Sequence, residues 1–141
     1  MGFSLSAATA IIGVSILISI EIIISTTIPT ITNVHDSYDE MRDRSIDRFQ
    51  TDINITSVLT SVNGSNYDLN VSLENTGSIT LVTQDFNILI NGVDKEFSST
   101  SNHLYPQNEV YFNIFNIAGS GANRLKIITN NGISDYYNYN T

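Results

Sequence analysis

Apolar residues dominate the first 34 positions of the chain, where Glu21 is the only charged side chain. About 20 consecutive apolar residues in a helix cross a bilayer core, and residues 11–24 are almost entirely Ile, Val, Leu and Ser. Because the backbone in lipid has to satisfy its own hydrogen bonds, this run forms a helix despite its many β-branched residues. The pattern predicts a single transmembrane helix over residues 1–31.

Two kinds of cleaved N-terminal signal also contain an apolar run. A secretory signal has a basic segment before that run and a small-residue cleavage site after it, and a pilin-like signal has a basic residue and its cleavage site ahead of the run. In this chain no Lys or Arg precedes Arg42, and the small residues 6–10 come before the apolar core. We therefore expect the segment to be retained.

Glu21 lies within the apolar run, where an ionisable group is costly. Two interpretations are open. Counted from Gly2, the side chain is near the far end of a 20-residue span and reaches the interface, or it is protonated and faces a partner helix. Pro29 is expected to kink or end the helix near its aqueous exit.

A weaker helical pattern continues over residues 32–50, which we interpret as a stalk. A narrow apolar seam follows a 3–4 spacing, and two oppositely charged pairs, Glu40–Arg44 and Asp39–Arg42, have helical spacing. The seam is too short to decide between a coiled coil and packing on the next domain. Its residues are Ile31, Val34, Tyr38, Met41 and Ser45.

From residue 51 onward the apolar positions alternate, as in strands with one buried face. Turn signals separate the runs, and Asn-Gly pairs predict hairpins at residues 91–92 and 131–132 because type I′ turns favour them. A change of parity predicts a bulge near residues 56–57. The residues expected to point inward are Ile53, Leu69, Val71, Leu73, Phe86, Ile88, Phe112, Ile114 and Ile127. Residues 51–141 are thus predicted to form an immunoglobulin-like β-sandwich, without the disulfide and core Trp of antibody domains.

Composition and charge restrict the chemistry of the chain. The net charge of −8 argues against a nucleic-acid partner, and the absence of cysteine excludes disulfides and thiolate sites. His35 and His103 have no neighbour at ligand spacing, so we expect no catalytic residue, metal or cofactor. Three sequons make Asn54, Asn63 and Asn70 candidate N-glycan acceptors if the domain lies outside the cell.

The opening MGFSLSAATAII, followed by one apolar span, a short acidic stalk and a small β domain, resembles the FlaF family of the archaeal archaellum motor. The stretch LENTGSITL at residues 73–81 is similar to strand–turn–strand segments of related archaellum proteins. The resemblance implies a single-pass anchor in the cytoplasmic membrane, with the immunoglobulin-like domain outside it.

The same resemblance implies partners. That domain is expected to bind the S-layer protein, together with a FlaG-like sister protein and other archaellum motor components, as a stationary part of the motor. A second copy of the chain is a further candidate, because sheet edges permit pairing. A filament subunit of the archaellin or pilin class and a generic surface adhesion module are the alternatives. The missing basic cleavage site argues against a filament subunit. The sequence does not distinguish an adhesion module from a motor component, because a fold does not fix a function.

Overall fold

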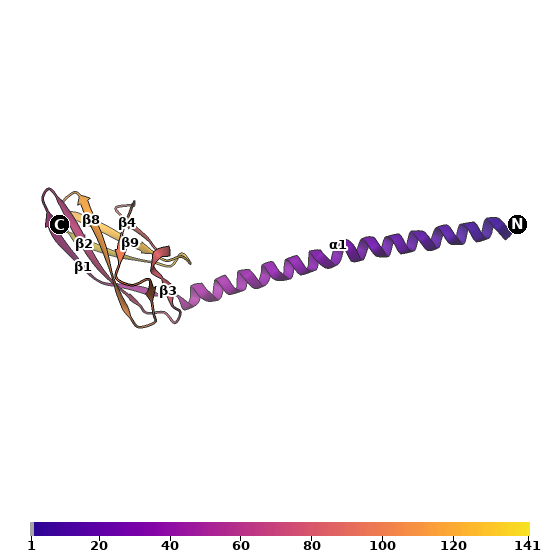
Figure 1. Ribbon diagram of the computed structural model, residues 1–141, viewed down its shortest axis with the longest axis horizontal. Coiled ribbons are helices and arrows are strands. Elements are labelled where there is room, and N and C mark those ends of the chain that lie inside the picture. The colour runs from indigo at the N-terminus through magenta and orange to yellow at the C-terminus, as the bar shows by residue number, and fades with distance from the viewer. Residues whose placement is uncertain (1) are drawn as a thin grey trace. The chain divides into compact units, whose positions relative to one another are not determined.

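The computed structural model describes residues 2–141, with one long helix followed by an all-β region (Figure 1). Contacts divide the chain into two compact units, one ending at Asp43 and the other running from Arg44 to Thr141. The elements are α1 (Gly2–Gln50), β1 (Ile53–Asn63), β2 (Asn66–Asn75), β3 (Leu81–Val82), η1 (Thr83–Asp85), β4 (Asn87–Ile90), β5 (Val93–Lys95), β6 (Ser98–Ser99), β7 (His103–Leu104), β8 (Glu109–Ala118), β9 (Ala122–Ile128) and β10 (Ser134–Asn140).

The N-terminal helix α1 is long and apolar enough to cross a membrane, with an 18-residue window of mean hydropathy 2.4. Several hydroxyl side chains of the apolar part are satisfied within the helix: those of Ser15 and Ser19 each donate to the carbonyl four residues earlier, at 2.8 Å. Pro29 does not end α1, which continues to Gln50. A proline removes one backbone hydrogen bond, and the helical residues on both sides keep theirs.

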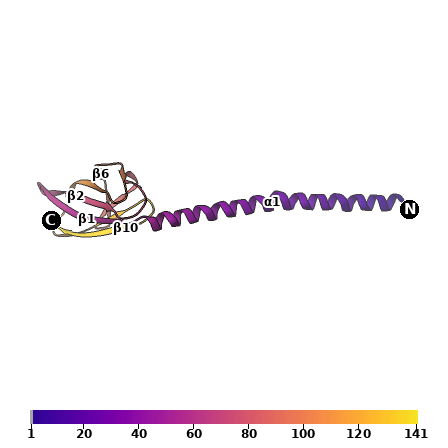
Figure 2. The ribbon, with the colours of Figure 1, turned by 90° about the horizontal axis from the view of Figure 1, so that it is seen from below.

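In the described residues, ten antiparallel strands form two four-stranded sheets and one small strand pair. The first sheet has the order β1-β2-β8-β6, the second has the order β10-β9-β4-β5, and β3 pairs with β7. The edge strands β1 and β10 lie side by side (Figure 2). The backbone N–H of Ile55 in β1 donates to Oδ2 of Asp135 in β10 at 2.8 Å, which joins the two sheets at this edge.

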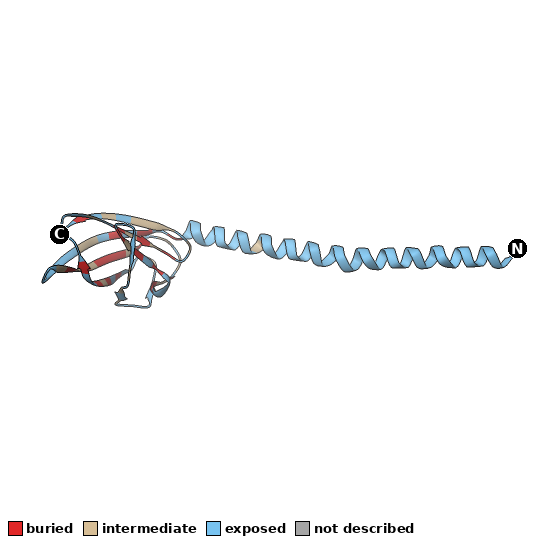
Figure 3. Cartoon of the chain, turned by 90° about the horizontal axis from the view of Figure 1, so that it is seen from above, coloured by how far each residue is buried: buried red, intermediate tan, exposed pale blue. Residues whose placement is uncertain are grey.

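The hydrophobic core fills the space between the two sheets (Figure 3). Alternate residues of β2, β4, β8 and β9 point into it, as expected for sheets with one buried face. All nine residues predicted to point inward are buried, so the predicted all-β sandwich is confirmed. They pack with the buried side chains of Ile55, Tyr67, Leu81, Ile90, Leu104, Val110, Ile117, Leu125 and Tyr139.

The predicted irregularities lie where the sequence signals place them, with one difference in geometry. The register of β1 shifts between Ile55 and Ser57, and Asn91 and Gly92 have the positive φ values, 52° and 84°, of a type I′ turn. The second hairpin has a longer loop, in which Thr129 N–H donates to Ile133 O at 2.8 Å. Only Gly132 of its Asn-Gly pair has positive φ, 81°. The type I′ geometry was therefore the wrong expectation there, and the loop is a type I turn followed by a bulge.

Candidate interaction surfaces

The structure does not bring together the residues that the sequence singles out. Glu21 lies in the apolar part of α1 and is exposed, whereas the three sequon asparagines lie on the first sheet. Asn54 and Asn63 belong to β1, and Asn70 belongs to β2. Their side chains follow the parity opposite to that of the buried residues, so they are on the outer face of this sheet.

The three asparagines differ in how their amide nitrogens are used. Asn70 Nδ2 donates to Asn113 Oδ1 at 2.7 Å, and Asn63 Nδ2 donates to the carboxylate of Asp68 at 3.2 Å. The exposed Asn54 makes no side-chain hydrogen bond within the described part of the chain. In an N-glycosylated asparagine, the sugar is bonded to this side-chain amide nitrogen. Asn54 can therefore be modified without the loss of an existing contact.

The outer face of the first sheet is polar and acidic. Glu74 of β2 and Glu109 of β8 lie directly opposite each other. Glu109 accepts hydrogen bonds from the hydroxyls of Ser72 and Thr56, the second at 2.6 Å, and from Tyr111 at 3.1 Å. These donors, Ser72 first, hold the pKa of Glu109 below its ordinary value. Thr56 lies in the β-bulge, which places its hydroxyl within reach of Glu109. The bulge was predicted from sequence, but this cluster of hydroxyls around Glu109 was not.

Several large apolar side chains are exposed at the end of the sandwich that holds the β1–β2 hairpin. Leu59 and Val62 of the edge strand β1 are 64% and 87% exposed, and Phe115 of β8 is 65% exposed. Phe115 lies at the irregular pairing of β2 with β8, next to Asn116, which has a positive φ of 58°. An edge strand with exposed apolar residues is a place where another chain can pair or pack.

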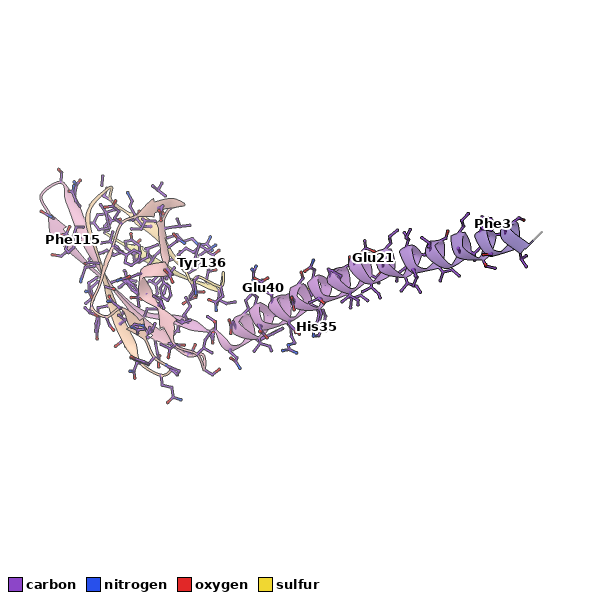
Figure 4. All side chains as sticks on the ribbon, turned by 45° about the vertical axis from the view of Figure 1, so that its right-hand side comes forward. Phe3, Glu21, His35, Glu40, Phe115 and Tyr136 are labelled. Carbon is purple, nitrogen blue, oxygen red and sulfur yellow. The ribbon has the colours of Figure 1, made fainter. Side chains whose placement is uncertain are left out.

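The outer face of the second sheet is basic and aromatic. Tyr136 of β10 lies directly opposite Lys126 of β9. The guanidinium carbon of Arg124 is 4.2 Å from the centre of the Tyr136 ring, and the Lys126 ammonium is 5.0 Å from it. A hydrogen bond from Lys126 and the two positive charges lower the pKa of Tyr136. Figure 4 shows Tyr136 and Phe115 at separate places on the sandwich.

Sequence reasoning also missed this basic and aromatic patch of Arg124, Lys126 and Tyr136. A signal was present, because Arg124 and Lys126 have the same parity in one predicted strand and the hairpin prediction places the following strand beside it. The cross-strand partner of Lys126 depends on the hairpin register, however, and the loop is longer than the predicted two-residue turn.

A third feature is the junction between the last turns of α1 and the sandwich, within the unit that begins at Arg44. The loop after β2 binds the chain at the helix end: Gly77 N–H donates to Asp52 O at 3.0 Å, and Ser78 N–H donates to Gln50 O at 2.8 Å. From the hairpin loop, Asn131 Nδ2 donates to the Thr51 hydroxyl at 2.6 Å. Two loops thus hold the helix end.

The turn at residues 75–77 has a clear structural part in this junction. Asn75 is buried and donates to the carbonyl oxygens of Ile79 and Leu104, at 2.7 and 3.0 Å. Its Oδ1 accepts the N–H of Gly77 at 3.0 Å. A Cβ atom on Gly77 would meet the backbone at Gln50 and would lie 2.6 Å from Asp52 N. Glycine is therefore required for the close approach of the loop to the helix end.

The described residues offer binding surfaces and hold no group of three side chains suited to a metal ion. His35 lies 3.4 Å from Asp39 on α1, and His103 stacks on Tyr105 with a ring separation of 6.2 Å. Both histidines are exposed. Their contacts are those of surface side chains, and the features that remain for function are the two outer faces, the β1 edge and the junction.

Comparisons with known proteins give the architecture. Neither a family model nor a curated protein matches this sequence. Among solved structures, the archaellum periplasmic stator protein FlaG from Sulfolobus acidocaldarius is similar, with a TM-score of 0.55 and 22% identity over 63% of this chain and 99% of that one. A chain of the stator protein complex FlaF and FlaG from the same organism matches with a TM-score of 0.52 and 21% identity, over 62% of this chain and 87% of the other. The chain has the β-sandwich fold of these stator proteins.

Proposed function

We propose that the chain is a membrane-anchored structural component of an archaellum motor, and that its sandwich is a stationary anchor outside the membrane. The observation that carries this proposal is the likeness to nearly the full length of a periplasmic stator protein. The apolar helix supplies an attachment, and the opening residues resemble the FlaF family. In this proposal residues 1–31 span the membrane, residues 32–50 form a stalk, and residues 51–141 form the external domain.

The proposed orientation places the N-terminus in the cytosol. By the positive-inside rule alone, Arg42 and Arg44 favour the opposite orientation, so the assignment depends on the likeness to periplasmic proteins. Protease treatment of intact protoplasts tests it. We expect residues 51–141 to be digested from outside, and complete protection of the sandwich would contradict this orientation.

The proposed partner of the external domain is the S-layer protein, with a FlaG-like protein beside it. The support for a sister protein is that one similar structure is a complex of FlaF and FlaG. Residues 44–141, immobilised, are expected to retain S-layer material and the sister protein from solubilised envelopes. Equal recovery on an unrelated acidic β-sandwich would contradict specific binding.

Asn54 is the sequon asparagine that we propose as the glycan acceptor, because its amide is exposed and makes no competing hydrogen bond among residues 2–141. Peptide mass analysis of the protein from its native cell tests this assignment. A glycan on Asn54 with unmodified Asn63 and Asn70 is the expected result. A glycan on Asn63 or Asn70 instead would contradict it.

For Glu21 we propose a contact with a partner helix in the membrane, since the position is costly for a lone carboxyl. Cysteine placed at residue 21 of this cysteine-free chain is expected to crosslink to a neighbouring component or copy in native membranes. Cysteine at Ile20 is the matched control. Equal crosslinking at both positions would contradict a contact specific to the Glu21 side of the helix.

A further inference from the structure

Two cations on the second sheet, Arg124 and Lys126, have no anionic partner among residues 2–141 of this acidic protein. Residues 51–141 hold three basic and eight acidic side chains, and yet no described carboxylate forms an ion pair with Arg124 or Lys126. Both are held against the Tyr136 ring instead. A cation beside an aromatic ring keeps its charge available to a ligand. The two charges are therefore fixed in place without being neutralised.

Two carboxylates of the second sheet could neutralise these cations, but one is already hydrogen-bonded and the other is distant. Asp135 accepts the backbone N–H of Ile55 with one oxygen and that of Tyr136 with the other, each at 2.8 Å. Asp94 lies in the same cross-strand row as Lys126, with Leu89 between them. Two strand spacings separate the two side chains by about 10 Å, which exceeds the screening length of about 8 Å at physiological salt.

The patch lines one of two shallow hollows that share Arg124 and Asn91. The first, of about 260 Å³, is lined by Leu89, Asn91, Gly92, Arg124, Lys126 and Tyr136. The second has the same volume and is rich in amides, among them those of Asn123, Asn138 and Asn140. Each volume is slightly smaller than that of the smallest pockets for drug-sized ligands, which is about 300 Å³. The pair suits two ring-sized groups in a row.

The amides differ in availability. Asn91 is used internally: its Oδ1 accepts the N–H of Arg124 at 2.9 Å, and its Nδ2 donates to Asn123 at 2.8 Å. Asn138, directly opposite Arg124, makes no side-chain hydrogen bond within residues 2–141. The side chain of Asn91 thus holds the turn to β9. Beside it, the Asn138 amide and the Arg124 guanidinium can each still bind a ligand.

We propose that this patch binds an acidic carbohydrate, with the carboxylate or sulfate of one sugar on Arg124 and Lys126 and the hydroxyls of the adjoining sugar on Asn138. Guanidinium groups pair with such anions through two hydrogen bonds, and amides both donate to and accept from hydroxyls. The Tyr136 ring, which is 45% exposed, supplies a flat apolar surface for a sugar ring.

Other anionic partners fit this surface less well. A peptide would need a free strand edge or an apolar groove, but β9 is paired on both sides, with β10 and β4, and the outer edge of β10 lies beside β1 (Figure 2). An anionic membrane attracts basic clusters by about 1 kcal/mol per Lys or Arg, and the external residues carry a net charge of −5 that opposes this attraction. The acidic sugar is the ligand that the charges, the ring and the amide together favour.

This inference rests on the proposed function only for where the ligand is found, on the cell envelope. Its test uses the full chain in a neutral detergent and isothermal titration with three tetrasaccharides. One alternates glucuronate with N-acetylglucosamine, one is 6-sulfated N-acetylglucosamine, and one is unmodified N-acetylglucosamine. We expect one or both acidic probes to bind at least tenfold more tightly than the neutral one.

The variants locate the binding. Arg124→Gln and Lys126→Gln are each expected to weaken binding of the acidic probe at least tenfold. Lys95→Gln removes the same charge from the same sheet, outside the patch, and is expected to change binding less than twofold. The proposal is overturned if neither acidic probe is preferred, if Lys95→Gln weakens binding as much, or if a hexaglutamate peptide binds as tightly as the sugar.

The binding measurement and the motor role can fail separately. Loss of the sugar preference in the purified protein overturns the carbohydrate site and leaves the anchor role to be judged by motility. Normal swimming of cells that carry only residues 1–50 overturns the anchor role, while the sugar titration keeps its own result.

Discussion

Tyr67 and Tyr139 place their hydroxyl groups 2.9 Å apart inside the sandwich and thereby connect β2 of the first sheet with β10 of the second. Their rings meet edge to face with centres 6.2 Å apart. Burial, together with this hydrogen bond, raises the pKa of Tyr139 above its ordinary value. Each hydroxyl is the hydrogen-bond partner of the other, and both side chains are buried.

Single removal of one hydroxyl is therefore expected to cost more than removal of both. Tyr67→Phe and Tyr139→Phe should each lower the free energy of unfolding by about 1–3 kcal/mol, because the remaining buried hydroxyl loses its partner. The double variant should lose less than the sum of the two. Urea unfolding of residues 44–141 measures all three. Additive losses would contradict the paired arrangement.

Glu109 is expected to make stability depend on acid. Its lowered pKa means that the folded state favours the carboxylate, so its contribution is present above the unfolded pKa of about 4.3 and is lost as the pH falls through the lower folded value. The melting temperature of the wild type minus that of Glu109→Gln should therefore decrease between pH 7 and pH 3. Glu74→Gln, on the same face, is the control. A difference that does not change with pH would contradict the account.

For single residues, the sequence predicts which side chains are buried better than it predicts which side chains contact each other. The inward residues such as Val71 and Ile88 follow from alternation, which is a local property of a strand. The contacting residues Tyr67 and Tyr139 are 72 positions apart in the sequence, and Thr56 and Glu109 are 53 positions apart. They depend on which strands become neighbours, and neither turn chemistry nor periodicity determines that.

Among the elements, the loop of residues 75–79 determines how the helix end is held. Gly77→Ala is expected to lower the free energy of unfolding of residues 44–141 by about 1–3 kcal/mol, because the new Cβ would press on backbone atoms of Gln50 and Asp52 that cannot turn aside. Ser78→Ala, the neighbouring control, keeps the backbone contact to Gln50 and should change little. Thermal unfolding of both variants measures the difference. Equal stability of Gly77→Ala and the wild type would contradict the close approach.

Turn signals located the strand connections and partly determined their geometry. Asn91-Gly92 forms the two-residue turn that its sequence predicts, because β4 and β5 pair up to Ile90 and Val93. Asn131-Gly132 does not, since Thr129 and Ile133 close the loop further out. Likewise, of the two outcomes expected at Pro29, a kink or an end of α1, the end does not occur, because the helix continues to Gln50. Local propensity yields to the pairing and helical hydrogen bonds on either side.

For the whole molecule, the unit from Arg44 to Thr141 contains every buried hydrophobic side chain of the described residues. We expect this fragment to fold alone, with the circular dichroism of a β protein. Ile88→Ala should lower its free energy of unfolding by about 2–5 kcal/mol through lost burial and a cavity. The exposed Val93→Ala should cost far less. A predominantly helical spectrum, or equal costs, would contradict the two-sheet core.

The architecture was predictable from sequence because each part has a strong periodic signal: a continuous apolar run, a 3–4 seam and then alternation. The interaction surfaces were not, since Arg124, Lys126 and Tyr136 meet only when two strands pair in one register. Function was suggested by the opening residues and the LENTGSITL segment, and the proposal that follows depends on the fold and the anchor together.

The central claim is that the external sandwich acts as a stationary anchor for a motor, and swimming speed tests it most directly. Cells would carry either the full chain or residues 1–50 joined to an unrelated β-sandwich, at equal protein levels in the membrane fraction. We predict that the first swim and that the second do not, although the anchor helix is present in both. Normal swimming of cells with the replaced sandwich would contradict the account.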